Sequence, residues 1–392
     1  MIPYGRQNIT EEDISEVIVA LKSDYLTQGP AIKEFEENFA EYIGAKYAVA
    51  ISNGTAALHL SALALNIAEG DKVITSPITF AASANCIRYC GGDVVFADID
   101  PETYLLDLRE VEKLLRNSPI GTYKGIIPVD FAGRAVNMEA FRKLADEFDC
   151  WIIEDACHAP GAYFTDNNGV KQKSGNSTFA DMAVFSFHPV KHIATGEGGM
   201  ITTNSEVLYN RLLALRTHGI TRNPALFRNT PSFACGEESN SYPNWYMEMQ
   251  TLGFNYRLTD FQSALGSSQL KRANAGLKRR REIAAKYHTF FSNEEYIMGQ
   301  SGVIDGHAYH LYVIETKDRL GLYNYLRERD IFAQVHYIPC HLMPYYKDLG
   351  WKEGDMPNSE KYYKHCLSLP MYPTLSDIEQ QFVMNSIRDF FS

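Results

Sequence analysis

Short apolar runs alternate with longer helical segments along the first half of the chain, and this alternation is the strongest constraint on the fold. The runs span residues 47–51, 72–75, 94–98, 125–129, 151–154 and 182–185. At four or five residues each, they are too short for helices and have the length of strands that are buried on both faces. Their repetition predicts βαβ units and an α/β fold around a mostly parallel sheet.

Helices are predicted between and before these strands. The connecting helices are expected at 52–65, 80–89, 108–115 and 138–148, and an earlier helix at 32–43. Thr10 and the three acids after it mark the start of the first helix, because hydroxyl caps and acidic residues favour helix N-termini. Its apolar positions follow helical spacing, at Ile14, Val17, Ile18 and Leu21.

A second, smaller domain is expected toward the C-terminus, since 392 residues exceed the usual size of one core. Residues 221–250 mix Pro, Gly and polar residues with aromatic ones and predict a long structureless loop of functional importance. Further helices are expected at 259–270, 273–291, 319–329 and 375–391, and strands at 310–314 and 332–335. We therefore divide the chain into a large domain, residues 1–270, and a small domain, residues 271–392.

Composition argues against several classes of protein. The formal charge of −11 disfavours a nucleic-acid binder, and the basic residues 278–281 are interpreted as a solvated helix face. The seven cysteines form no CxxC pair, which is typical of reduced thiols and not of a disulfide framework or a zinc site, so no metal is expected. Neither a signal peptide nor an apolar run long enough for a membrane span is present, so we expect a cytoplasmic enzyme that binds no membrane.

Lys191 lies in a segment that predicts covalent chemistry. Ser186 directly follows the strand 182–185, and Lys191 lies five residues later. Asp155 directly follows the strand 151–154. The carboxyl ends of parallel strands form the ligand-binding edge of such a sheet. An amine, a carboxylate and phosphate donors together match pyridoxal phosphate (PLP), whose aldehyde binds an amine and whose ring nitrogen pairs with an acid.

Other residues have candidate roles around this cofactor. Gly54 and Thr55 begin a helix whose free N–H groups suit a phosphate, although the segment also reads as an ordinary βα turn. His158 is a candidate partner of the phenolic oxygen of PLP, and Phe80 is a candidate to stack on the pyridine ring. Residues 197–199 predict a tight turn that returns the chain to 200–203 as an antiparallel edge hairpin.

Six motifs in order along the chain resemble those of the DegT/DnrJ/EryC1/StrS sugar aminotransferases. They lie at 26–29, 53–58, 77–80, 154–158, 187–191 and 253–257. The resemblance implies the PLP-dependent transferase fold of type I, which is aspartate aminotransferase-like. This fold has a mostly parallel, seven-stranded sheet in a large domain and a smaller C-terminal α/β domain.

The same resemblance implies roles for individual residues. Lys191 would be the catalytic lysine that binds the aldehyde of PLP, and Asp155 would hold the ring nitrogen. The phosphate would be held by Ser186, Gly54 and Thr55. A homodimer with shared active sites is also implied, because Asn255 would reach the cofactor phosphate of the neighbouring subunit.

Within the family, residues 187–191 and 334–339 are similar to the transaminases that make UDP-4-amino-4,6-dideoxy-N-acetyl-β-L-altrosamine for pseudaminic acid. This similarity implies that a UDP-linked 4-keto-6-deoxy-N-acetylhexosamine receives an amino group at C4, with L-glutamate as the donor. The residues that would touch the sugar nucleotide are Tyr4, Tyr25, Leu26, Thr27, His336 and Tyr337. His192 departs from the family pattern, in which a small residue follows the lysine.

Three alternatives stay open. Enzymes of the bacillosamine or perosamine type would use the same cofactor residues on another nucleotide-linked sugar. A PLP-dependent sugar dehydratase of the family would carry histidine in place of Lys191, which disfavours it. A non-catalytic PLP-binding module fused to a DNA-binding domain is disfavoured because the chain has no spare segment for one.

Overall fold

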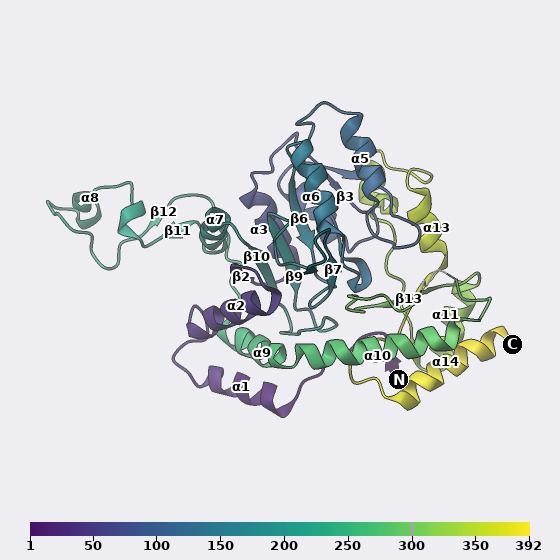
Figure 1. Ribbon diagram of the computed structural model, residues 1–392. Coiled ribbons are helices and arrows are strands. Elements are labelled where there is room, and N and C mark those ends of the chain that lie inside the picture. Colours follow the sequence, from purple (N-terminus) through teal and green to yellow (C-terminus); the bar gives the residue numbers. More distant parts are fainter. Residues whose placement is uncertain (299–301) are drawn as a thin grey trace.

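A seven-stranded sheet forms the centre of the molecule in the computed structural model, which describes residues 1–298 and 302–392 (Figure 1). The strand order is β2-β10-β9-β6-β5-β3-β4. The strands are β2 (Tyr47–Ile51), β3 (Lys72–Thr75), β4 (Asp93–Phe96), β5 (Tyr123–Ile127), β6 (Trp151–Asp155), β9 (Met182–Ser186) and β10 (Gly199–Thr203). Neighbouring strands from β9 to β4 are parallel, and β10 is antiparallel to both of its neighbours.

The predicted mostly parallel α/β sheet is therefore confirmed, and the predicted edge hairpin is wrong in one respect. β10 does return antiparallel to β9, but it lies between β9 and β2. Every residue of β10 is buried, whereas Tyr47 of β2 is not fully buried. The apolar strand 47–51 can take the edge position because α2 (Pro30–Ile43) and α7 (Glu206–Arg216) pack against it.

Helices cover both faces of the sheet. They are α3 (Gly54–Ala64), α4 (Ala82–Tyr89), α5 (Leu108–Arg116), α6 (Met138–Glu147) and α7 (Glu206–Arg216). Apolar residues on one face pack with α3, α4 and α7, and those on the other face pack with α5 and α6. Val73 and Ile74 of β3 belong to different clusters because successive side chains of a strand point to opposite faces. A short helical turn, η1 (Phe131–Gly133), follows β5, and the small hairpin β7 (Tyr163–Thr165) and β8 (Lys171–Lys173) follows β6.

The first helix has its predicted bounds, but its apolar face lies on the outside. α1 (Glu11–Leu21) is capped by Thr10 and packs on α9 (Asp260–Lys271). Its buried residues are Asp13 and Ala20, and four apolar side chains are 43–63% exposed: Ile14, Ile18, Val19 and Leu21. The amphipathic pattern thus identifies the helix correctly, while much of its apolar side stays exposed among the described residues. α2 (Pro30–Ile43) lies against β2 and α9.

Residues 219–252 form a folded arm, which corrects the prediction of a structureless loop. The arm contains β11 (Ile220–Thr221), η2 (Pro224–Leu226), α8 (Pro231–Cys235) and β12 (Glu248–Met249), and it stands away from the body (Figure 1). Glu248 accepts hydrogen bonds from the backbone N–H groups of Arg228 and Asn229, which closes the arm on itself. Phe227, Tyr242 and Tyr246 pack together inside it.

The C-terminal part is joined to the body by the long helix α10 (Ala273–Phe291), which runs along the base of the molecule (Figure 1). Its strands are β13 (Tyr312–Glu315) and β15 (Cys366–Leu369), which pair with each other, and β14 (Ile331–Phe332). β14 pairs with β1 (Ile2–Pro3) from the start of the chain. The remaining elements are α11 (Arg319–Glu328), η3 (Cys340–Leu342), α12 (Pro344–Asp348), α13 (Pro357–His365) and α14 (Asp377–Phe391). The proposed domain boundary at residue 270 falls one turn before α10 begins.

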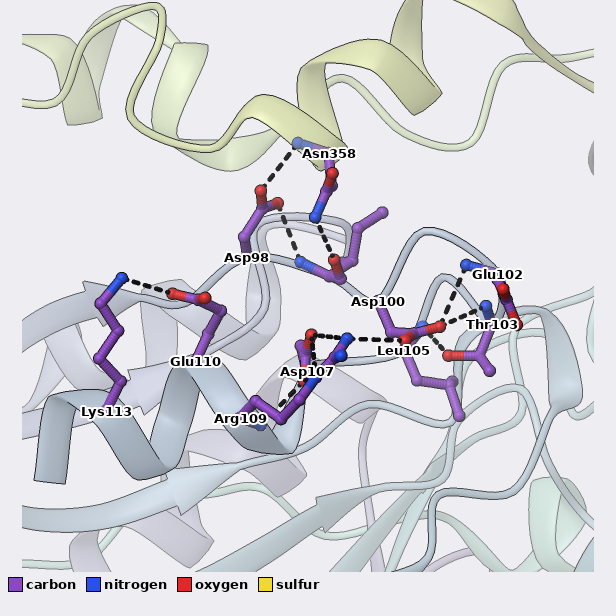
Figure 2. A network of polar contacts seen from close by, with 11 residues as sticks. Asp98, Asp100, Glu102, Thr103, Leu105, Asp107, Arg109, Glu110, Lys113 and Asn358 are labelled. Atoms are coloured by element: carbon purple, nitrogen blue, oxygen red, sulfur yellow. Dashed lines mark hydrogen bonds and ion pairs between the residues drawn. The ribbon is translucent and has the colours of Figure 1, made fainter. Parts of the chain in front are cut away.

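Asp98, which follows β4, anchors α13 to the large sheet. Its carboxylate accepts a hydrogen bond from the backbone N–H group of Asn358 (Figure 2). It accepts another from the backbone N–H group of Ser359, also at the start of α13. An acidic group at a helix N-terminus is favourable because the first N–H groups of a helix have no partners within it. No helix among the described residues has the length and apolarity needed to cross a membrane.

Candidate active site

A cavity of about 680 Å³ lies at the carboxyl edge of the sheet. The position follows from the topology: β6 ends in Asp155, β9 ends in Ser186, and α3 begins at Gly54 directly after β2. The lining residues are Tyr4, Asn53, Gly54, Thr55, Leu58, Thr79, Phe80, Ala82, Ser83, Val129, Asp155, Cys157, His158, Ser186, His188, Val190, Lys191, Glu197, His336 and Tyr337. The volume is in the usual range for pockets that bind small molecules and cofactors.

Most residues singled out in the sequence meet in this cavity. The predicted residues that line it are Tyr4, Gly54, Thr55, Phe80, Asp155, His158, Ser186, Lys191, His336 and Tyr337. Four predicted residues do not line it and are exposed: Tyr25, Leu26, Thr27 and Asn255. These four lie in the segment after α1 and in the segment between the arm and α9. Their proposed roles therefore need a contact that one chain does not make.

Asp155 is held as a double acceptor on the floor of the cavity. Its Oδ2 accepts a hydrogen bond of 2.6 Å from the Ser83 hydroxyl, and its Oδ1 accepts one of 3.1 Å from the Cys157 N–H. The carboxylate is 5% exposed. Both bonds fix the orientation of an anion that faces the cavity, which is the arrangement required to hold a protonated ring nitrogen.

The start of α3 provides a seat for a phosphate. The side chain of Asn53 caps the Ala56 N–H, and the Asn53 carbonyl accepts from Ala57. The N–H groups of Gly54 and Thr55 have no acceptor in the part of the chain that the structure describes. A Cβ added at Gly54 would lie 3.0 Å from the Cβ of Ser186, so only glycine lets the Ser186 hydroxyl approach these donors closely. Free N–H groups, a helix N-terminus and a hydroxyl together suit a dianion.

Lys191 lies on the loop between β9 and β10. The Lys191 N–H donates to the His188 carbonyl at 2.8 Å, and the Thr195 N–H donates to Phe187 at 2.9 Å, so both ends of the loop are tied down. Burial lowers the pKa of the Lys191 amine, while Cys157 and Asp155 oppose this shift. A lowered pKa increases the neutral fraction of the amine, and only the neutral amine can bond to an aldehyde or accept a proton.

His158 and Tyr337 form an ordered hydrogen-bonded pair. The Ala132 N–H donates to Nδ1 of His158 at 3.3 Å, and Nε2 lies 3.2 Å from the Tyr337 hydroxyl oxygen. Burial holds the pKa of His158 well below its usual range, so the ring is neutral. Because Nδ1 is an acceptor, the single proton is on Nε2, which donates to Tyr337. The proton of the Tyr337 hydroxyl is then available to a ligand in the cavity.

Tyr4 and His336 meet on the other wall of the cavity. Their rings are 5.0 Å apart, and Nδ1 of His336 lies 2.8 Å from the Ser368 hydroxyl. Burial lowers the pKa of His336 to about 3, so this ring too is neutral. The pairing of β1 with β14 brings these residues together, because Tyr4 follows β1 and His336 lies shortly after β14.

The residues of the cavity fit PLP. An acid on the floor of the cavity suits the ring nitrogen, unpaired backbone donors and Ser186 suit the phosphate, and a partly buried lysine of lowered pKa suits the aldehyde. Sequence reasoning missed Ser83, Asn53 and Cys157. The signal for Ser83 was weak, since its contact with Asp155 spans 72 residues. Asn53 and Cys157 each stand next to a predicted residue, so their neighbourhood was a usable signal.

Comparisons with known proteins agree with this geometry. The model of the DegT/DnrJ/EryC1/StrS aminotransferase family matches residues 7–388. The spore coat polysaccharide biosynthesis protein SpsC of Bacillus subtilis is 38% identical, with 99% of this chain and 96% of that protein covered. The UDP-4-amino-4,6-dideoxy-N-acetyl-β-L-altrosamine transaminase of Campylobacter jejuni is 35% identical over 99% of this chain and 96% of its own. The GDP-perosamine synthase of Escherichia coli O157:H7 is 32% identical over 100% and 99%.

Solved structures are equally similar in fold. The Helicobacter pylori aminotransferase PseC, involved in pseudaminic acid biosynthesis, superposes with a TM-score of 0.85 at 30% identity, covering 100% of this chain and 99% of that one. The PLP form of the sugar aminotransferase Spr1654 from Streptococcus pneumoniae gives a TM-score of 0.86 at 27% identity, covering 99% and 98%.

Proposed function

The chain belongs to the DegT/DnrJ/EryC1/StrS aminotransferase family, and from this premise we propose that it aminates C4 of a UDP-linked 4-keto-6-deoxy-N-acetylhexosamine, with glutamate as the donor. Family membership makes it a PLP-dependent enzyme of fold type I that acts on nucleotide-linked sugars. One observation supports the reaction class above all: Lys191, Asp155 and the N-terminus of α3 line one cavity. The choice of sugar rests on the relative from Campylobacter jejuni, which is 35% identical.

In this mechanism the chain would hold the cofactor at two points. Asp155, oriented by Ser83, would keep a negative charge opposite the ring nitrogen. Gly54, Thr55 and Ser186 would donate to the phosphate. When bound, PLP supplies an aldehyde that takes up amino groups and a ring that withdraws electrons from the neighbouring carbon.

Lys191 moves the protons of both half-reactions. Its amine takes the proton from Cα of the amino donor, and later delivers a proton to C4 of the sugar. Burial of the site favours this role, because it lowers the pKa of the amine and excludes bulk water. Phe80 covers the ring position, with its centroid 6.3 Å from that of Tyr337.

The sugar nucleotide is proposed to enter between Tyr4, His336 and Tyr337. These side chains present aromatic faces and one hydroxyl with an available proton, which suit a sugar ring. A diphosphate also needs cations, and Lys191 is the one lysine or arginine among the described residues that line the cavity. A second subunit is therefore proposed to complete the site, with Asn255 and the neighbouring Arg257 as the residues it contributes.

Two exposed features support a homodimer. The apolar side of α1 and the adjacent Tyr25 and Leu26, 54% and 49% exposed, form an uncovered surface. The arm exposes Trp245 and Met249 at 69% and 66%. Large uncovered apolar surfaces are unusual on monomeric proteins and mark interfaces. A second copy of the chain is the partner that would also account for the exposure of Asn255.

The test is product identification. The purified enzyme is incubated with L-glutamate and, separately, UDP-linked and GDP-linked 4-keto sugars, and NMR gives the position and stereochemistry of the new amine. We expect amination of the UDP-linked 4-keto-6-deoxy-N-acetylhexosamine to the altrosamine product. A bacillosamine-type or perosamine product would overturn the choice of sugar. Lys191→Ala should lose transamination and the visible absorbance of bound PLP, and full turnover by this variant would refute the mechanism.

A further inference from the structure

Two buried acids, Asp130 and Glu154, lie directly behind Asp155 and have no role in the mechanism described above. Asp130 is 0% exposed, Glu154 3% and Asp155 5%. None of the ion pairs formed by the described residues includes Asp130 or Glu154. Three carboxylates without cations of their own cannot all be ionised in the interior, since each buried charge costs several kcal/mol in hydration. At least one of the three must hold a proton.

The backbone joins this acid pair to the cofactor residues. The Asp130 N–H donates to the Asp155 carbonyl at 3.0 Å, and the Asp155 N–H donates to Pro128 at 2.9 Å. Oδ1 of Asp130 accepts from the Val136 N–H at 2.8 Å and so closes the turn that carries Ala132. Ala132 has a positive φ of 59° and presents its N–H to His158. Asp130 thus supports Asp155 through its backbone N–H, and it supports His158 through the turn that its side chain closes.

The two carboxyl groups face each other, and each is among the causes of the pKa shift of the other. Two carboxylates are acceptors only, so a hydrogen bond between them requires a proton on one of them. Oδ2 of Asp130 is buried and has no hydrogen-bond partner among the described residues, and the groups near it that could donate are a protonated Glu154 and the Ser174 hydroxyl. Burial and the neighbouring acids raise the pKa of Glu154, and burial raises that of Asp130 to about 6. The groups that face the pair are Asp155, the Ser174 hydroxyl and the Gly175 N–H.

We infer that Glu154 and Asp130 share one proton and act as positioning residues that leave Asp155 as the charged carboxylate facing the cofactor. This inference rests on the proposed function for the role of Asp155. Glu154 is the partner that carries the proton, because Oδ1 of Asp130 accepts a hydrogen bond from the Val136 N–H, and such a bond favours the ionised form of Asp130. Strand alternation puts the side chains of Glu154 and Asp155 on opposite faces of β6, so the proton is behind the cofactor site and out of reach of the substrate.

Infrared spectroscopy of the holoenzyme tests the proton directly. We expect the carbonyl band of a buried protonated carboxylic acid at neutral pH in the wild type and in the control Glu206→Gln, which changes an exposed acid on α7. Glu154→Gln should lack this band. Its persistence in Glu154→Gln, or its absence from the wild type, overturns the inference.

Measurement of PLP affinity distinguishes a role of Glu154 in positioning Asp155 from a role in folding alone. The amide of Glu154→Gln can donate to Asp130 without a proton, so its dissociation constant for PLP should stay within about threefold of wild type. Glu154→Leu removes the donor and should weaken PLP binding about tenfold or more. Equal affinities for the two variants contradict the role. If the wild type shows the band but does not bind PLP, the proposed function fails while the shared proton stands.

The pH dependence of stability provides a further measurement. A carboxyl whose pKa is raised in the folded state binds its proton more tightly there than in the unfolded chain, where the value is about 4. The contribution of this pair to the free energy of unfolding should therefore fall as the pH rises from about 4 through 6 and beyond, whereas buried neutral histidines such as His158 and His336 contribute an opposite slope. The slope of the free energy of unfolding against pH should be more positive in Glu154→Gln than in the wild type, and Glu206→Gln should leave it unchanged. An unchanged slope in Glu154→Gln would count against the shared proton.

Discussion

Asp155→Asn is expected to separate cofactor binding from folding. The two oxygens of Asp155 accept from the Cys157 N–H at 3.1 Å and from the Ser83 hydroxyl at 2.6 Å. An asparagine oxygen can keep the bond to Cys157, and its NH₂ then faces Ser83. The Ser83 hydroxyl can accept from this amide because it can turn to donate to Thr79, whose hydroxyl oxygen is 2.7 Å away. All three hydrogen bonds survive, so the free energy of unfolding of the PLP-free protein should change by less than about 1 kcal/mol.

The affinity for PLP should change far more. Asp155→Asn removes the charge that faces the ring nitrogen, and the loss of one partner of a buried charge pair costs about 2–5 kcal/mol. At about 1.4 kcal/mol per factor of ten, the dissociation constant for PLP should rise about 30-fold or more. Fluorescence titration with PLP gives this constant, and urea unfolding gives the stability. Asp24→Asn, on an exposed segment, is the control for charge. A rise of less than about threefold would refute the role given to Asp155.

Two further predictions concern α1. Ile18→Glu adds a charge to its exposed apolar side, so sedimentation should show a dimeric wild type and a monomeric variant. Ser15→Glu, also exposed on α1, is the control. A monomeric wild type would contradict the proposed interface. Asp13→Ala removes the buried partner of Arg272 and Gln269 and should lower the free energy of unfolding by about 2–4 kcal/mol. This loss is smaller than the loss for a fully buried ion pair, because the Arg272 side chain is 30% exposed. Urea unfolding measures this loss. In the control Glu16→Ala, which removes an exposed ion pair with Lys271, the free energy of unfolding should fall by less than about 1 kcal/mol. Equal losses in the two variants would refute a larger contribution from the buried ion pair.

The sheet and the cofactor half of the site were predictable because they depend on short-range pattern. Strand 47–51 and the helix from Leu108 were predicted within a residue or two of β2 and α5, since each apolar run ends at a clear turn. Asp155 and Ser186 were found because residues at the carboxyl ends of parallel strands share one edge. Asp130 follows β5 at the same edge, and the same rule, applied once more, would have found it.

Other features depend on contacts that periodicity does not encode. The apolar stripe of α1 was recognised, but nothing local shows that Asp13 on the opposite side would be buried by Arg272. The arm was taken for a loop because the closure by Glu248 joins residues about twenty positions apart along the chain. Tyr25, Leu26, Thr27 and Asn255 are exposed in the single chain, and the contacts proposed for them are with another copy of the chain, which local sequence patterns do not encode.

The reversed direction of β10 has a consequence for how this enzyme can diversify. An antiparallel neighbour lets the chain turn back at the same edge, whereas a parallel one requires a crossover to the opposite end of the sheet. The loop that carries Lys191 is therefore bounded on both sides by buried strands of the central sheet. Tyr4 and His336 instead belong to segments near the two ends of the chain, tied together by β1 and β14. If Tyr4 and His336 contact the sugar as proposed, changes in those segments would alter which sugar is accepted without moving the loop that carries Lys191.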